Sequence, residues 1–210
     1  MTAPEPAPSP EPAPTPEAGP GPKAEAPSRW NVANGLTVLR ILLVPLFGAL
    51  LLADGGADPT LRMVAFAVFT LAALTDKADG TLARRYNLIT DFGKLADPIA
   101  DKALIGMALV GLSVLGELSW WITIVIMARE LGITALRLRV RRRAVIAASR
   151  GGKVKTVLQV VAIALLVLPL SGWPHTVAMI VMAAAVVVTV VTGLDYVVRA
   201  WRLRGEAGRG

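Results

Sequence analysis

The sequence predicts an all-α integral membrane protein with six transmembrane helices and a polar active site at the cytoplasmic interface. Hydrophobic residues make up 54% of the 210 residues, a fraction too high for an ordinary soluble domain. Six apolar segments are long enough to cross a bilayer as helices, and the basic residues gather in only some of their connections. The chain has no cysteine and one histidine, which excludes disulfides, thiolate nucleophiles and zinc sites built from these residues.

Each predicted helix is an apolar run of about 17 to 25 residues, the length that a bilayer crossing requires. The connections at 54–60, 116–119 and 171–174 are short and contain no Lys or Arg. We expect the helices to cover residues 36–53, 61–83, 98–116, 119–138, 154–170 and 175–198.

The predicted membrane domain occupies residues 29–204 and lies between two polar tails. Residues 1–28 hold ten of the fifteen prolines, interleaved with Ala and Glu, and contain no apolar run that could build a core. We expect them to form a disordered cytoplasmic tail, and residues 205–210 to form a short flexible tail.

The distribution of basic residues predicts the orientation of the chain. Eight Lys and Arg residues lie between residues 137 and 155, and four more follow residue 198. The positive-inside rule places these segments, the 84–97 connection and both termini in the cytoplasm. The net charge of +7 predicts contact with membrane lipid rather than nucleic acid, because no aromatic-basic interleaving accompanies it.

Four aspartates lie near the cytoplasmic ends of the second and third predicted helices. Asp76 and Asp79 are three residues apart and share one face of the second helix. Asp97 and Asp101 share a face of the third, where Pro98 predicts the first turn and Asp97 its N-cap. Helices joined by a short connection pack as antiparallel neighbours, so we expect the four carboxylates to converge.

Four converging carboxylates at the edge of the hydrocarbon repel one another unless a positive charge lies among them. Either arginines of the chain or bound divalent cations can supply that charge. Carboxylate oxygens suit hard cations such as Mg²⁺ or Mn²⁺, and two such ions about 4 Å apart are a recurring device for displacement at phosphorus. Gly80 and Ala83 leave the same helix face bare, so that a ligand can approach the backbone closely.

The spacing of these residues resembles the signature of the CDP-alcohol phosphatidyltransferases, integral membrane enzymes that make phospholipids. The matching residues are Asp76, Asp79, Gly80, Ala83, Arg84, Gly93, Asp97 and Asp101. The resemblance covers about residues 30–200 and implies attack of an alcohol hydroxyl on the lipid-bearing phosphorus of a CDP-linked lipid, with release of CMP. It also implies a multi-pass enzyme of the bacterial cytoplasmic membrane and, as is common in the family, a homodimer.

The resemblance implies roles for the matching residues. The expected ligands of two divalent cations, Mg²⁺ or Mn²⁺, are Asp76, Asp79, Asp97 and Asp101. Asp101 is also the expected general base. The CDP part of the lipid is expected to contact Gly80, Ala83, Arg84 and Gly93.

The first predicted helix begins with a polar face. Asn34, Thr37 and Arg40 are spaced by three residues, and Arg40 lies inside an apolar span, where a charge without a partner is costly. The carboxylate and phosphate cluster is one partner for Arg40, and extension of its side chain to the interface is the alternative. We include all three residues in the expected CDP-binding site.

Basic residues around the 139–153 connection predict a site for the phosphate of the acceptor alcohol. The expected residues are Arg129, Arg137, Lys153 and Lys155. The two lysines flank a helix start, whose dipole favours phosphate. The chain resembles the phosphatidylglycerophosphate synthase branch of the family in two segments, Arg129-Glu130-Leu131 and Gly152-Lys153-Val154-Lys155-Thr156. The reaction implied is CDP-diacylglycerol plus sn-glycerol 3-phosphate giving phosphatidylglycerol phosphate and CMP.

Other functions stay open on the sequence. A cardiolipin synthase or a phosphatidylinositol phosphate synthase of the same family uses the same chemistry with phosphatidylglycerol or an inositol phosphate as acceptor. A divalent-cation transporter could use similar carboxylates. Transport sites favour the bilayer midplane between repeats, however, and this chain has no visible repeat.

Overall fold

The computed structural model describes the backbone of residues 32–85, 91–140 and 150–207, and within these ranges the side chains of residues 34–75, 96, 99–136, 154–198 and 201. This part of the chain contains helices and no strand, as the sequence predicts. The six α-helices are α1 (Val32–Leu52), α2 (Pro59–Arg85), α3 (Asp91–Val114), α4 (Trp120–Val140), α5 (Arg150–Val167) and α6 (Trp173–Ala207). A short 3₁₀ helix, η1 (Ala53–Gly56), follows α1.

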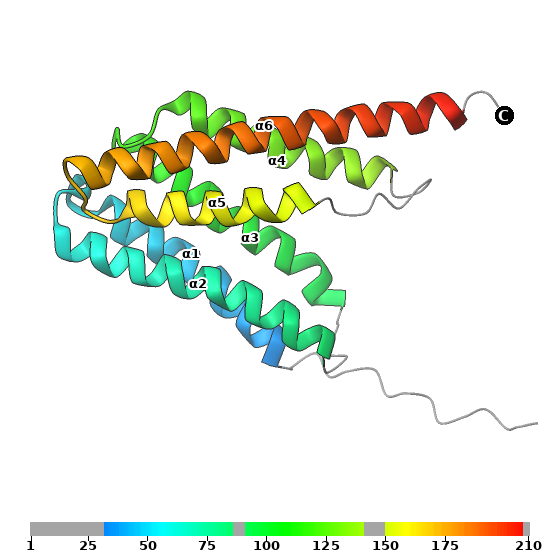
Figure 1. Cartoon of the computed structure of the whole chain (residues 1–210). Helices are drawn as coiled ribbons and strands as arrows, with labels where there is room; N and C mark the ends of the chain where they lie inside the picture. Colours follow the sequence, from blue (N-terminus) through cyan, green and yellow to red (C-terminus); the bar gives the residue numbers. More distant parts are fainter. Residues whose placement is uncertain (1–31, 86–90, 141–149, 208–210) are drawn as a thin grey trace, which may run out of the picture.

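The helices alternate in direction and form one bundle (Figure 1). α1 packs against α2 and α3, while α6 packs against α4 and α5. α5 also contacts α2 and α3, so it joins the two groups. The connections after α1, α3 and α5 lie together at the end drawn on the left of Figure 1, whereas α2 and α4 end, and α3 and α5 begin, at the other end.

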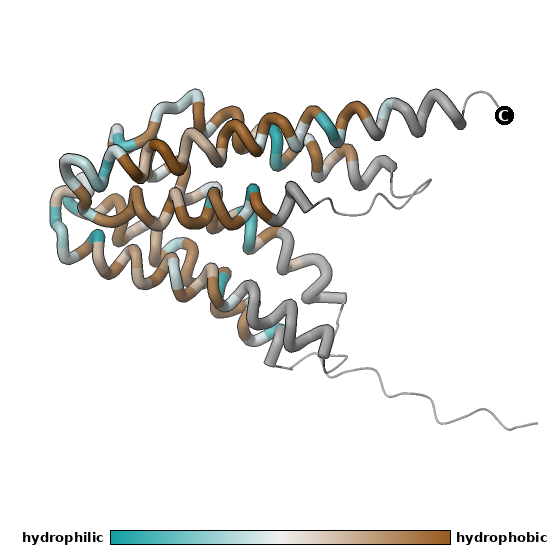
Figure 2. The backbone as a smooth tube through the Cα atoms, viewed as in Figure 1, coloured by the Kyte–Doolittle hydropathy of each residue, from teal (hydrophilic) through white to brown (hydrophobic). Residues whose placement is uncertain are grey.

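Apolar side chains cover both the inside and the outside of the bundle. Figure 2 shows hydrophobic colour along most of the described helices, with hydrophilic residues at the left-hand turns. The core includes Phe47 and Phe69, yet Leu42, Ile180 and Leu194 are each more than 60% exposed. A contiguous apolar exterior marks a surface that contacts lipid or protein. Among the described residues, Asn34–Gly56 and Trp173–Val198 are each long and apolar enough to cross a membrane.

The third helix begins earlier than predicted. α3 starts at Asp91, so Asp97 is not an N-cap and Pro98 does not mark the first turn. Both of these predictions were wrong. A proline removes one backbone hydrogen bond, a loss that neighbouring helices can accommodate in an apolar bundle, so the proline signal did not locate the helix start. One consequence is that Asp97 and Asp101 both lie on regular helix.

The last two helices also differ from the predicted ranges. α5 covers Arg150–Val167 and ends two residues before Pro169, because the residue before a proline is disfavoured in the α conformation. Its first turn therefore contains Gly151, Gly152 and Lys153. α6 continues to Ala207, nine residues beyond the predicted end, because loss of apolar character marks the end of the hydrocarbon and not of the helix.

Arg62 forms hydrogen bonds and an ion pair that connect three elements at the end of the bundle with the short connections. Its Nε donates to the carbonyl of Val167 at 3.0 Å, and its Nη2 donates to the carbonyl of Leu166 at 2.6 Å. These carbonyls belong to the last turn of α5, where a backbone C=O has no N–H partner within the helix. Its Nη1 lies 2.6 Å from Oε1 of Glu117, in the connection between α3 and α4, whose Oε2 lies 3.7 Å from Nδ1 of His175 on α6. This buried arginine was not predicted as a structural residue.

We expect Arg62→Met to destabilise the bundle by about 2–4 kcal/mol, because it leaves two buried carbonyls and one carboxylate without their donor. The midpoint of thermal unfolding of the detergent-purified protein, followed by tryptophan fluorescence, should fall by several degrees. Met63→Ala, at the exposed neighbouring position, is the matched control and should leave the midpoint nearly unchanged. Equal midpoints for the two variants would contradict the role assigned to Arg62.

Candidate active site

The predicted metal ligands lie on two helices that contact each other. Asp76 and Asp79 lie in α2, Asp97 and Asp101 lie in α3, and α2 contacts α3. Antiparallel packing therefore places both pairs at the end of the bundle that carries the α2–α3 connection (Figure 1). Of the four side chains, only that of Asp101 lies within the described residues. Their convergence stays a prediction.

The other residues of the phosphatidyltransferase signature lie where the structure describes only the backbone. They are Gly80, Ala83, Arg84 and Gly93. The backbone assigns the first three to the last turns of α2 and Gly93 to the first turn of α3.

The polar face of α1 is buried, as its spacing predicts. Asn34 is 6% exposed, and Thr37 and Arg40 are almost fully enclosed. This excludes the alternative that Arg40 extends to the surface. α1 packs against both α2 and α3, so the buried polar face lies at the same end of the bundle as the aspartates. The guanidinium of Arg40 is held inside the protein, where it can balance negative charge.

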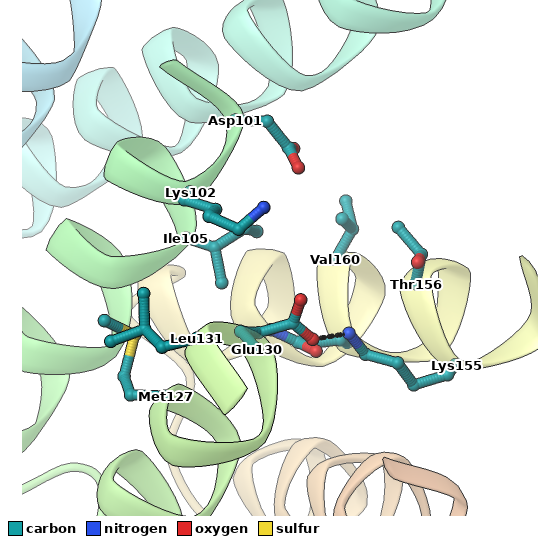
Figure 3. A pocket seen from close by; sticks show the side chains of 10 residues that line it. Asp101, Lys102, Ile105, Met127, Glu130, Leu131, Lys155, Thr156 and Val160 are labelled. Carbon is teal, nitrogen blue, oxygen red and sulfur yellow. Dashed lines mark hydrogen bonds and ion pairs between the residues drawn. The ribbon is translucent and has the colours of Figure 1, made fainter. Parts of the chain in front are cut away.

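A pocket opens between α3, α4 and α5 (Figure 3). α3 contributes Asp101, Lys102 and Ile105, and Asp101 is exposed to solvent. The remaining lining residues are Met127, Glu130 and Leu131 of α4 and Lys155, Thr156, Gln159 and Val160 of α5. The pocket therefore combines a solvent-accessible carboxylate, basic and amide side chains, and an apolar wall.

Lys155 is held in this pocket by an ion pair. Its side chain is buried, and its Nζ donates to Oε1 of Glu130 on α4, as the dashed line in Figure 3 marks. A buried charge is tolerated only when it is paired, so this contact joins α4 to α5. An ammonium group has three donors, and the pair with Glu130 engages one of them. The other two leave Lys155 able to bind an anion in the pocket.

Arg129 contacts the same glutamate and lies on the side of α4 that faces α6. Its Nη1 lies 3.2 Å from Oε1 of Glu130, and its Nη2 donates to Oγ1 of Thr192 on α6 at 3.1 Å. Its side chain lines a groove between α4 and α6 and not the pocket that contains Asp101. A Cβ at Gly193 would lie 3.1 Å from Cγ of Arg129, so the absence of a side chain there lets α6 approach the arginine.

The structure brings together two of the predicted site residues, Asp101 and Lys155, from different helices. The predicted side chains of Arg137 and Lys153 lie outside the described residues. Glu130 and Gln159 line the pocket but were not predicted as site residues. A signal for each exists in the sequence, because Glu130 is an acidic residue within an apolar segment and Gln159 lies one helical turn after Lys155.

Comparison with known proteins gives the same family along most of the chain. The sequence profile of the CDP-alcohol phosphatidyltransferase family matches residues 30–191. A probable phosphatidylglycerophosphate synthase of Mycobacterium tuberculosis is 58% identical over 172 residues, which cover 82% of both chains.

More distant relatives carry a related name. A CDP-diacylglycerol–glycerol-3-phosphate 3-phosphatidyltransferase of Bacillus subtilis is 36% identical over 82% of this chain and 96% of its own. A protein of the same name from Salmonella paratyphi A is 37% identical over 80% of this chain and 93% of its own.

We expect the ion pair of Glu130 and Lys155 to stabilise the bundle cooperatively. Glu130→Leu leaves a buried ammonium without its partner and should lower the free energy of unfolding. The double variant with Lys155→Met removes both charges, so it should lose less than the sum of the two single losses, by at least about 1 kcal/mol. Thermal unfolding of the four proteins in detergent measures this coupling, and Val157→Ala, exposed on α5, is the control. Additive losses would show that the two residues do not interact.

Proposed function

Because the chain belongs to the CDP-alcohol phosphatidyltransferase family, we propose that it transfers the phosphatidyl group of CDP-diacylglycerol to sn-glycerol 3-phosphate. The products are phosphatidylglycerol phosphate and CMP. A hydroxyl oxygen of glycerol 3-phosphate forms a bond to the lipid-bearing phosphorus, and the bond from that phosphorus to CMP breaks. The pocket that holds a carboxylate and a buried lysine on different helices supports this choice of acceptor.

Asp101 and Lys155 act on different groups of the acceptor. Asp101 takes the proton of the attacking hydroxyl as that proton becomes acidic in the transition state. Lys155, already fixed by Glu130, binds the phosphate of glycerol 3-phosphate with its remaining donors. The start of α5 adds the backbone N–H groups of its first turn, which favour a phosphate. Together these groups orient the acceptor so that its hydroxyl faces the donor lipid.

Asp76, Asp79, Asp97 and Asp101 would hold two divalent cations, Mg²⁺ or Mn²⁺. The donor set fits such ions because all four groups are carboxylates, and the backbone assigns them in pairs to two contacting helices. Bound cations would offset the charge of the diphosphate and of the departing CMP. The protein itself therefore needs no covalent nucleophile.

The buried face of α1 is proposed to bind the CDP part of the donor. Arg40 supplies a positive charge inside the protein, and Asn34 and Thr37 supply hydrogen-bonding groups on the same face. The other proposed CDP-binding residues are Gly80, Ala83, Arg84 and Gly93. They lie on the two helices that α1 contacts.

We place the protein in the bacterial cytoplasmic membrane with six crossings and with both termini and the active site in the cytoplasm. The two apolar spans, the outward apolar residues and the basic connections support this placement. The donor's acyl chains can then stay in the bilayer while glycerol 3-phosphate enters from water. We also propose a homodimer, because members of the family are commonly dimers.

The alternatives fit the site less well. Phosphatidylglycerol, the acceptor in cardiolipin synthesis, offers no phosphate monoester to the buried Lys155. An inositol phosphate does, but the relatives above carry the names of enzymes that act on glycerol 3-phosphate. A cation transporter leaves the pocket on α4 and α5 without a role.

The proposed reaction predicts release of CMP only with the correct acceptor. We expect detergent-purified protein with CDP-diacylglycerol and Mg²⁺ or Mn²⁺ to release CMP with glycerol 3-phosphate, but not with phosphatidylglycerol or inositol 1-phosphate. Asp101→Asn should lower the rate by about 100-fold or more, because the general base is lost. Release with another acceptor would overturn the choice of alcohol and leave the chemistry in place.

The matched control for that variant is Asp58→Asn. Asp58 lies at the opposite end of the bundle and accepts a hydrogen bond from the backbone N–H of Thr60 at 2.7 Å. An asparagine caps a helix equally well, so this variant should keep the full rate. Equal losses in the two variants would show that the effect of Asp101→Asn is not specific to the site.

The proposed metal site predicts dependence on divalent cations. We expect a chelator to abolish CMP release, and titration with Mg²⁺ or Mn²⁺ to restore it with saturation. Asp76→Asn removes one charged ligand, so it should shift the titration at least about tenfold to higher cation concentration. An unchanged rate in excess chelator would contradict the proposed site.

A further inference from the structure

Gln159 is a polar side chain in the pocket that the reaction as described does not use. It lines the pocket on α5 and is only 3% exposed. Within the part of the chain that the structure describes, its Oε1 has no hydrogen-bond partner. A buried acceptor without a donor destabilises the protein, and an apolar residue of similar shape would avoid this cost. The position of Gln159 therefore calls for a ligand that donates a hydrogen bond.

The neighbours of Gln159 indicate where that ligand lies. Lys155 is four residues earlier on α5, so the two side chains share one face of the helix, one turn apart. Ile105, Met127 and Val160 form the apolar part of the same lining. A group bound at Gln159 thus belongs to the molecule whose anionic end is bound by Lys155.

The chemistry of an amide oxygen selects among the groups of the acceptor. A phosphate dianion has only acceptors, so it does not satisfy Oε1 of Gln159. A hydroxyl has a donor and does. Glycerol 3-phosphate has a phosphate for Lys155, a primary hydroxyl that Asp101 deprotonates, and a secondary hydroxyl on the middle carbon. The secondary hydroxyl is the group left for Gln159.

We propose that Gln159 is a specificity-determining residue that accepts a hydrogen bond from the secondary hydroxyl of the acceptor. This inference rests on the proposed function, and it adds the reason why the site takes a polyol phosphate and not a simple hydroxyalkyl phosphate. An acceptor that lacks the hydroxyl leaves the buried oxygen unpaired, so the enzyme should discriminate against it.

The test compares two acceptors that differ by one oxygen. 3-Hydroxypropyl phosphate retains the primary hydroxyl and the phosphate of glycerol 3-phosphate but lacks the secondary hydroxyl. We expect the wild-type protein to prefer glycerol 3-phosphate by about tenfold or more in kcat/KM, measured as CMP release. In Gln159→Met, an apolar replacement of similar shape, the preference should fall to about threefold or less, while KM for CDP-diacylglycerol stays unchanged.

Controls separate the possible failures. Val157→Met, at an exposed position on the same helix, should keep the wild-type preference. An unchanged preference in Gln159→Met would overturn the role of Gln159. The wild-type comparison is decisive even if this variant does not fold, because equal use of the two acceptors by the wild-type protein would also overturn it. Absence of CMP release with both acceptors in folded wild-type protein would instead overturn the proposed function on which the inference rests.

Discussion

A buried charge in an apolar bundle must find its partner within the chain, and this constraint fixes which helices are neighbours. Arg62 of α2 binds carbonyls of α5 and the carboxylate of Glu117. Lys155 of α5 binds Glu130 of α4, and Arg129 of α4 binds Thr192 of α6. Helices covered by apolar residues on all sides can slide and rotate at small cost, because one apolar contact replaces another. Directional contacts of charged groups remove that freedom.

The two ends of the bundle use polar groups differently. At the end with the short connections, Arg62 donates to three protein groups, and the hydroxyl groups of Ser113 and Thr123 lie 2.7 Å apart. At the other end, Asp101 faces solvent, and Oε1 of Gln159 has no partner among the described residues. Satisfied groups hold helices in place, whereas groups that remain available can bind a substrate. The first end therefore supports the site at the second, together with the contacts of Lys155 and Arg129 beside it.

The sequence predicted the helices and the chemistry better than it predicted the partners of individual residues. Apolar length alone identified the six helices, because a bilayer sets the minimum length of a crossing. The ends of α3, α5 and α6 were less predictable, since Pro98 lies within a helix while Pro169 follows the end of one. The spacing of Asp76 to Asp101 predicted the family that the comparisons confirm. The contact of Lys155 with Glu130 depends on how α4 packs against α5, which no local pattern contains.

The contrast between Glu130 and Gln159 shows how one pocket can be both stable and selective. Glu130 is a charged acceptor whose Oε1 is already engaged by two basic side chains of the protein, so an acceptor alcohol gains little by donating to that oxygen. Gln159 is a neutral acceptor on the same pocket wall as Lys155, and a neutral group does not repel the phosphate that the lysine attracts. A carboxylate at position 159 would be satisfied by Lys155 and would weaken its hold on the anion. A glutamine retains hydrogen-bonding capacity and leaves the charge of the site to Lys155, which is what recognition of a molecule carrying both a phosphate and hydroxyl groups requires.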